Sequence, residues 1–200
     1  MKSSRKRTLW TLAIVIGLLG VVTTYFLSSC CFPALHRPVA YDGDYKGRVV
    51  DEQTREPIEG VVITAVWSYL CPTPAGQISG FYDAIETLTD ERGDFTVPGK
   101  GLRLFIDLDT ARVSIFKAGY EYFEYNWKTL RIGRILSQKI KWEEDRAVIP
   151  LRKLTEEERL KGSISFGPHA DPKYRRFFDK EMNKLLIERG MRPMPIGDEK

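Results

Sequence analysis

The chain has 200 residues, of which 42% are hydrophobic and 12% aromatic, and its formal net charge is +4. This composition is typical of a folded globular chain and excludes an intrinsically disordered one. Four of the 31 basic residues lie at the extreme N-terminus, so the other 27 balance the 27 acidic residues. The excess charge therefore belongs to the N-terminus, and we expect no nucleic-acid-binding surface.

Residues 1–29 have the pattern of a membrane-targeting segment. A basic stretch, Lys2 to Arg7, precedes nineteen uncharged residues, Leu9 to Leu27. That length is close to the roughly 20 residues needed to span a bilayer as a helix. The basic end should stay cytoplasmic, so the rest of the chain faces an extracytoplasmic compartment.

Two interpretations of this segment remain open. The sequence Leu27-Ser28-Ser29-Cys30 resembles the lipobox of bacterial lipoproteins, which implies cleavage before Cys30 and lipidation of its thiol. The alternative is an uncleaved membrane anchor. In either case residues 30–43, which contain Pro33 and Pro38, are expected to form an extended tether.

The residues that usually carry catalysis are scarce. The three cysteines (Cys30, Cys31 and Cys71) form no C-x-x-C pair, and the two histidines lie far apart, at His36 and His169. A nucleophile needs a base within hydrogen-bond reach, and imidazole is a common metal ligand. We therefore expect no enzymatic activity, no metal and no cofactor. Whether Cys31 and Cys71 pair is open, because their Cα atoms would have to lie within about 7 Å.

Short β-branched and aromatic runs separated by turn signals fill residues 44–152. We expect Lys46–Asp51 and Val61–Trp67 to form a strand pair whose polar connection ends at Gly60. Residues 68–80 contain two prolines and two glycines and are expected to form a loop. Further strands are predicted at 84–89, 95–97, 102–106, 112–116, 121–127 and 147–152. Seven or so short strands without an intervening helix predict an all-β sandwich.

Several motifs in this region resemble the carboxypeptidase regulatory-like domain. They are Gly47-Arg48-Val49-Val50-Asp51, Thr54, Pro57-Ile58-Glu59-Gly60-Val61, Thr89-Asp90 with Gly93 and Phe95, and Lys117-Ala118-Gly119-Tyr120. The resemblance implies a seven-stranded, transthyretin-like (prealbumin-like) Greek-key sandwich over residues 44–152. It also implies an accessory, non-catalytic module, with insertions at 68–80 and 128–145.

Aromatic residues flank the predicted 68–80 loop, namely Trp67, Tyr69, Phe81 and Tyr82. Aromatic rings that are exposed and coplanar can stack on sugar rings. These four residues are therefore the candidate ligand-binding residues of an alternative hypothesis, a carbohydrate-binding module for a polysaccharide.

The insertion at 128–142 carries five basic residues and no acidic one. Such a stretch can contact anionic head groups or a surface polysaccharide. The alternative is a solvated insertion over the sandwich.

Residues 153–200 form a C-terminal extension in which we expect two helices. Thr155 and Glu158 have the spacing of a capping box, which predicts a helix that ends at Gly162. Asp171-Pro172 predicts the start of a second, amphipathic helix ending at Gly190. Its apolar face, packed on its own domain or on a partner or membrane, consists of Tyr174, Phe177, Phe178, Met182, Leu185 and Leu186.

Together these features predict a non-catalytic protein of the cell envelope, membrane-anchored and facing the periplasm or the exterior. Its parts are a signal peptide or anchor (1–29), a tether (30–43), the sandwich (44–152) and the helical extension (153–200). We expect a structural or protein-interaction module whose partners are the membrane and an envelope protein.

Overall fold

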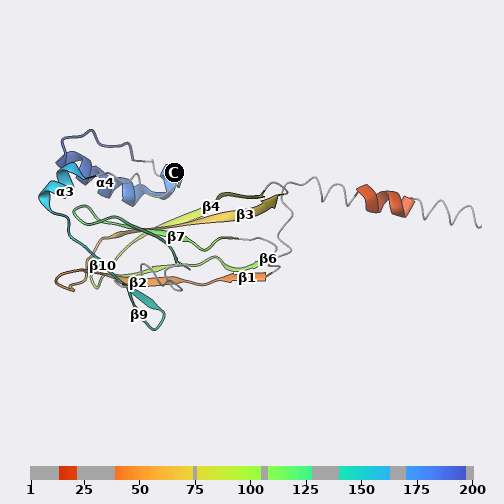
Figure 1. Cartoon of the computed structure of the whole chain (residues 1–200), viewed down its shortest axis with the longest axis horizontal. Helices are drawn as coiled ribbons and strands as arrows, with labels where there is room; N and C mark the ends of the chain where they lie inside the picture. Colours follow the sequence, from red (N-terminus) through yellow and green to blue (C-terminus); the bar gives the residue numbers. More distant parts are fainter. Residues whose placement is uncertain are drawn as a thin grey trace, which may run out of the picture.

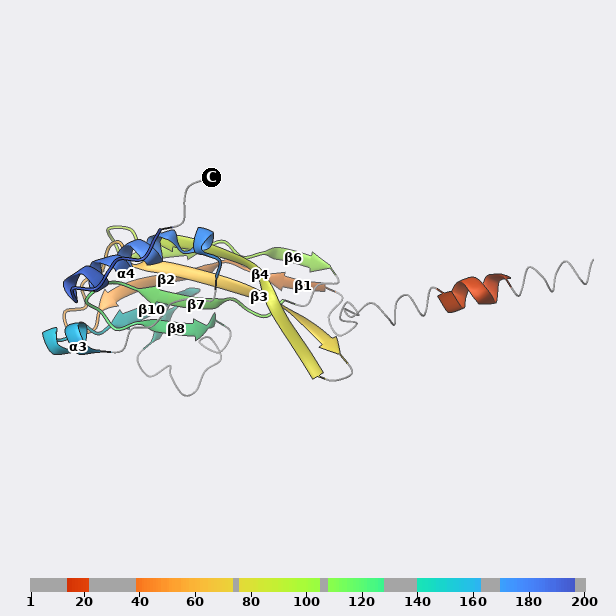
Figure 2. The same cartoon turned by 90° about the horizontal axis from the view of Figure 1, so that it is seen from above.

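The computed structural model describes residues 14–21, 39–73, 76–104, 108–127, 140–162 and 170–196. Two four-stranded sheets pack face to face, with strand orders β5-β2-β10-β9 (the β2 sheet) and β4-β3-β7-β8 (the β3 sheet). A two-stranded ribbon pairs β1 with β6, at the right-hand end of the sandwich in Figures 1 and 2. The strands are β1 (Val39–Asp42), β2 (Tyr45–Asp51), β3 (Val62–Thr73), β4 (Gly76–Leu88), β5 (Asp94–Val97), β6 (Gly101–Leu104), β7 (Arg112–Phe116), β8 (Phe123–Asn126), β9 (Lys141–Glu143) and β10 (Arg146–Leu151).

The architecture is the predicted all-β sandwich, but the described residues contain ten strands instead of about seven. Strand β1 lies inside the stretch expected to be a tether, and β9 lies inside the insertion expected at 128–145. Neither has the β-branched run on which strand prediction depends. Each forms because a partner strand provides hydrogen bonds, β6 for β1 and β10 for β9.

The predicted pairing of the first two long strands is wrong. Strand β2 pairs in parallel with β10 and antiparallel with β5, whereas β3 pairs with β4 and β7 in the other sheet. The apolar run of β3 is buried on both faces, because the core covers Ile63 and a helix packs over Val62. Such a run identifies a central strand, but it does not say to which sheet the strand belongs.

The prediction of a loop at 68–80 is also wrong, because most of these residues belong to strands β3 and β4. Strands β3 and β4 continue their antiparallel pairing outward, through Tyr69 opposite Gly80 and Cys71 opposite Ile78, after a register shift between Trp67 and Ser68. A Cβ atom at Gly80 would lie 2.3 Å from the Tyr69 ring. The glycine therefore marks a place where an aromatic ring covers the backbone, and not a turn.

The core lies between the two four-stranded sheets. The Tyr45 ring centroid is 5.8 Å from that of Trp67 and 5.4 Å from that of Trp127. Gly47 makes this packing possible, because a Cβ atom there would lie 2.5 Å from the Phe95 ring. The first residue of the predicted sandwich motif is therefore a requirement of core packing.

The predicted turn between β4 and β5 is present. The Asp90 carboxylate accepts hydrogen bonds from the amides of Arg92 and Asp94, at 2.9 and 2.8 Å. Gly93 has φ +71°, and a Cβ atom there would lie 2.4 Å from the carbonyl oxygen of Val49. A side chain at this position is excluded both by the backbone conformation and by the neighbouring strand.

The C-terminal helices follow the prediction closely. Helix α3 (Glu156–Lys161) has the full capping box at Thr155 and Glu158, and its C-cap is Gly162. A 3-10 turn, η1 (Pro172–Tyr174), is capped by Asp171 and precedes α4 (Arg176–Glu188). Four of the six predicted stripe residues, Phe178, Met182, Leu185 and Leu186, pack with Val62 and Phe116 on the outer face of the β3 sheet. This is the first of the alternatives left open for the stripe, whereas Tyr174 lies in η1 and Phe177 is exposed.

Residues 14–21 form a helix with exposed apolar side chains. The rest of the predicted segment Leu9–Leu27, together with Cys30 and Cys31, lies outside the described residues. None of the helices within the described ranges is long and apolar enough to cross a membrane.

Candidate functional site on the outer faces of the sandwich

The four candidate aromatic residues do not form a common platform. Trp67 is fully buried, and its Nε1 donates a hydrogen bond to Asp42 at 2.8 Å, so the expectation of an exposed ring is wrong for this residue. Tyr69 lies opposite Gly80 and Phe81 opposite Ser68, which places the two rings on opposite faces of the hairpin. Tyr82 is partly buried against the core and accepts a hydrogen bond from Arg103.

Phe81 borders a small groove on the outer face of the β3 sheet. The groove has a volume of about 340 Å³, and its polar lining includes the hydroxyls of Ser68, Ser79 and Ser114. Its charged groups, Arg112 and Glu124, pair with one another at 3.4 Å. This groove therefore offers hydroxyl hydrogen bonds but little uncompensated charge.

Next to this groove, α4 covers the same face and is fixed at its N-terminus by Glu86 of β4. The Glu86 carboxylate accepts hydrogen bonds from the amides of Phe177 and Phe178, at 2.8 and 2.9 Å, and from the Thr64 hydroxyl at 3.4 Å. A carboxylate here satisfies two free helix amides and complements the helix dipole. Burial raises the pKa of Glu86, and it also raises that of the nearby Asp179.

Further hydrogen bonds fix the remainder of α4. Glu181 accepts from the amide of Ala118 at 3.0 Å, and Asn183 and Met194 bond to each other reciprocally. Arg189 donates to the carbonyl oxygen of Gly162 at 2.7 Å, which ties α4 to the end of α3. Helix α4 is therefore an integral layer of the domain.

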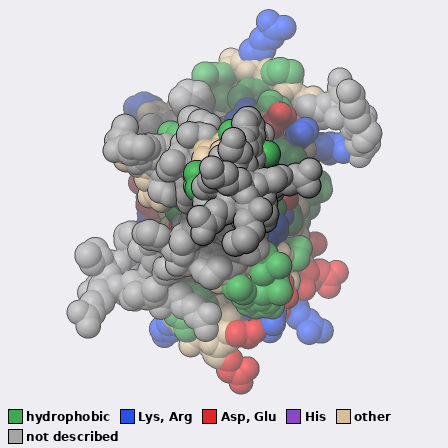
Figure 3. All heavy atoms as spheres, turned by 90° about the vertical axis from the view of Figure 1, so that its right-hand side faces the viewer, with side chains coloured by type: hydrophobic (Ala, Val, Ile, Leu, Met, Phe, Trp, Pro, Cys, Tyr) green, Lys and Arg blue, Asp and Glu red, His purple; other side chains and the backbone are tan. Residues whose placement is uncertain are grey.

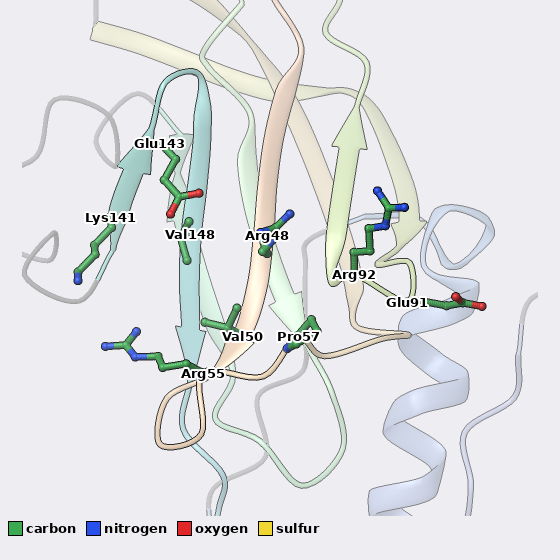
Figure 4. A pocket seen from close by; sticks show the side chains of 9 residues that line it. All are labelled: Arg48, Val50, Arg55, Pro57, Glu91, Arg92, Lys141, Glu143 and Val148. Carbon is green, nitrogen blue, oxygen red and sulfur yellow. The ribbon is translucent and has the colours of Figure 1, made fainter.

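The opposite outer face, that of the β2 sheet, carries an open groove of about 570 Å³ (Figure 4). Strand register places Asp94, Arg48, Val148 and Lys141 in one row across this sheet. The groove is lined by Arg48, Val50, Arg55, Pro57, Glu91, Arg92, Lys141, Glu143 and Val148. Its floor is apolar and its rim is mainly basic.

One of the four basic side chains is neutralised inside the structure. Arg48 donates two hydrogen bonds to Asp94, at 2.8 and 3.1 Å, and Arg146 approaches the same carboxylate at 3.2 Å. The hydrogen bond from Arg48 lowers the pKa of Asp94. The single negative charge of Asp94 is therefore shared by the guanidinium groups of Arg48 and Arg146, so these three side chains together carry a net positive charge.

The other three basic residues are Arg55, Arg92 and Lys141, and none of them forms an ion pair with another described residue. They come from the β2–β3 connection, the β4–β5 turn and β9, and Figure 4 shows them around the groove. In the sequence, Lys141 is distinguished only as part of a basic stretch, and no binding pattern marks Arg55 or Arg92. The parallel pairing of β2 with β10, which assembles the groove, leaves no local pattern in the sequence.

This arrangement is suited to binding. Both histidines lie outside the described residues, and the described part of the chain contains no cluster of His, Cys, Asp and Glu that could hold a metal. Long cationic side chains around an apolar floor can attract and hold an anionic partner.

Searches with family models and with curated proteins gave no match. Three solved structures are similar to parts of the chain. A streptococcal ancillary pilin is 13% identical over 57% of this chain and 30% of its own, with a TM-score of 0.29. The pilus adhesin RrgA of Streptococcus pneumoniae is 17% identical over 56% of this chain and 15% of its own, also at 0.29.

The third similar structure is 3-chlorocatechol 1,2-dioxygenase of Rhodococcus opacus 1CP. It is 14% identical over 60% of this chain and 62% of its own, with a TM-score of 0.32. The chain thus spans less than a third of the length of either pilus protein. Likenesses this distant carry no conclusion about activity or partners.

Proposed function

We propose that this protein is a non-catalytic, envelope-anchored β-sandwich that binds a partner protein through the outer face of the β2 sheet. The observation that carries the proposal is the contrast between the two outer faces. Helix α4 packs on the β3 sheet, whereas the β2 sheet has an open groove whose rim carries Arg55, Arg92 and Lys141, none of them in an ion pair with another described residue.

The chemistry of the groove favours an acidic, partly apolar protein segment. Val50, Pro57 and Val148 form a floor on which apolar side chains can pack. Arg92 and Lys141 stand at the rim, where charge complementarity accelerates association and selects among partners. An arginine guanidinium can also bind a carboxylate through two hydrogen bonds, which gives orientation as well as affinity.

Membrane attachment is part of the proposal. It is supported by the basic N-terminus and the uncharged segment Leu9–Leu27, with Cys30 as the proposed lipidation site. We also retain the resemblance to the carboxypeptidase regulatory-like domain as a proposal. It is supported by Gly47 and Gly93, two motif glycines at positions where a Cβ atom would clash.

The test is crosslinking in intact cells followed by affinity capture of the tagged full-length chain. The informative variant combines Arg92→Glu with Lys141→Glu, since both side chains are exposed and neither forms an ion pair that the fold needs. Lys180→Glu, an exposed charge reversal on α4, is the matched control. We expect one reproducible acidic partner that is lost with the double variant and kept with the control.

Equal capture by the wild type and the double variant would overturn the assignment of the groove. Loss of the partner only with Lys180→Glu would move the interaction to the α4 face. Labelling with a radioactive fatty acid tests the anchor separately, because equal labelling of wild type and Cys30→Ala would exclude lipidation at Cys30.

A further inference from the structure

The β1–β6 ribbon exposes its apolar side chains to solvent and turns its polar side chains toward the protein, which is the reverse of the usual arrangement. Its register places Val39 opposite Leu104 and Tyr41 opposite Leu102, so the four side chains share one face. All four are exposed, with exposed fractions of 58% for Val39, 55% for Leu104, 78% for Tyr41 and 65% for Leu102. The apolar face of the ribbon is thus turned outward.

The polar side chains of the ribbon point toward the protein instead. Asp42 accepts hydrogen bonds from the Nε1 of buried Trp67 at 2.8 Å and from the amide of Lys100 at 2.9 Å. The Arg103 guanidinium lies 5.1 Å from the centre of the Tyr82 ring. These contacts fix the register, because a shift by one residue would move every side chain to the other face.

The β3–β4 hairpin exposes a further apolar side chain near the end of the sandwich where the ribbon lies. The outer part of the β3–β4 hairpin extends toward the same end as the ribbon in both views, and it exposes Ile78 (Figures 1 and 2). Figure 3 looks onto this end and shows hydrophobic side chains exposed among charged ones. Large exposed apolar side chains gathered at one end of a protein typically mark a protein or membrane contact.

The position of the ribbon in the chain favours a membrane. The uncharged segment ends at Leu27, and only eleven residues lie between it and Val39. Eleven residues span at most about 40 Å when fully extended. Whether the bilayer holds this segment or an acyl chain on Cys30, which is nearer still to Val39, the first strand of the domain must therefore begin close to that bilayer. Tyr41 is also of a residue type that is enriched at membrane interfaces.

We propose that the β1–β6 ribbon is a lipid-contacting surface, with Val39, Tyr41, Leu102 and Leu104 inserted at the boundary between head groups and acyl chains. This inference rests on the proposed membrane attachment. It adds a second contact, which fixes the orientation of the sandwich on the membrane. A domain attached only through its tether would tumble freely, whereas two contacts present the rest of its surface in a defined direction.

The test uses the full chain in vesicles of phosphatidylethanolamine and phosphatidylglycerol, part of which carries brominated acyl chains that quench tryptophan fluorescence. Leu102→Trp places a reporter on the ribbon. Leu160→Trp is the matched control, because Leu160 is an exposed leucine on α3, at the other end of the molecule (Figure 1). Tyr41→Trp is a second, conservative ribbon variant. Vesicle flotation of every variant reports membrane attachment independently.

We expect the fluorescence contributed by the added ribbon tryptophan to fall by roughly half, since an interfacial side chain reaches the outer acyl region. The tryptophan at position 160 should keep its intensity. Flotation without additional quenching at positions 41 and 102 would overturn the ribbon contact and leave the attachment intact. Failure of the wild type to float would overturn the attachment and, with it, this inference.

Discussion

The two outer faces of the sandwich are completed in different ways. On the β3 sheet, α4 buries an apolar stripe and is fixed by hydrogen bonds along its length, beginning at Glu86. On the β2 sheet, charged side chains from two strands and two connections surround an open groove (Figure 4). The comparison indicates that stability is concentrated on the first face, while the second face is available for a partner.

The interactions on the two faces contribute different amounts of free energy to folding. Burying a large apolar side chain stabilises a fold by about 1.5–3 kcal/mol, whereas an exposed ion pair contributes about 0–1 kcal/mol. Phe178 of α4 belongs to the first category, and the pair of Arg48 with Asp94 belongs nearer to the second. Substitutions on the two faces should therefore differ in their effect on unfolding.

The largest effect is expected for Phe178→Ala. This side chain is 1% exposed and its ring centroid lies 4.9 Å from that of Phe116. Its removal should lower the free energy of unfolding by about 3–5 kcal/mol, because it leaves a cavity between α4 and the sheet. Phe177→Ala is the control, since Phe177 is 37% exposed. Urea denaturation measures both, and equal effects would contradict the view that α4 is packed as a layer.

A smaller effect is expected for Glu86→Ala, which removes the cap of α4. Loss of the acceptor for two helix amides should cost about 1–2 kcal/mol. Amide hydrogen exchange should show faster exchange at Phe177 and Phe178, with the β2 sheet unchanged. Unchanged exchange at these two amides would show that the carboxylate does not hold the helix.

The pH dependence should have opposite signs on the two faces. Burial raises the pKa of Glu86 above 4.5, so the folded state holds its proton more tightly than the unfolded state. The contribution of Glu86 to stability should therefore increase as the pH falls toward 4.5. The pKa of Asp94 is lowered from 3.8, so its contribution is present above that value and is lost as the pH falls below it.

The pH prediction is checked by denaturing the wild type and Glu86→Gln in urea at neutral pH and near pH 5. The wild type should gain stability relative to the variant at the lower pH. A relative loss of stability would mean that hydrogen bonding to the carboxylate outweighs its burial.

The smallest effect is expected for Asp94→Asn on the open face. The ion pair with Arg48 is partly exposed, so the loss should be about 0.5–1 kcal/mol. Salt should reduce the difference between variant and wild type, because exposed pairs are screened. A loss as large as that of Phe178→Ala would contradict the comparison of the two faces.

Local patterns in the sequence predicted the features that local chemistry determines. The capping box at Thr155, the Asp90–Gly93 turn and the apolar stripe of α4 all depend on neighbouring residues. Strand pairing depends on residues far apart, such as Ile149 opposite Val49, and local patterns did not reveal it. For the same reason the sequence did not suggest the groove on the β2 sheet.

Lysine footprinting of the full chain tests the central claim most directly. Lys141 on the open face and Lys180 on α4 are both exposed, so an amine-reactive reagent should modify both in the purified protein. In intact cells, Lys141 should be protected by the bound partner while Lys180 stays reactive. Equal reactivity of Lys141 in the two settings, or protection of Lys180 instead, would contradict the assignment of the β2 sheet as the interaction face.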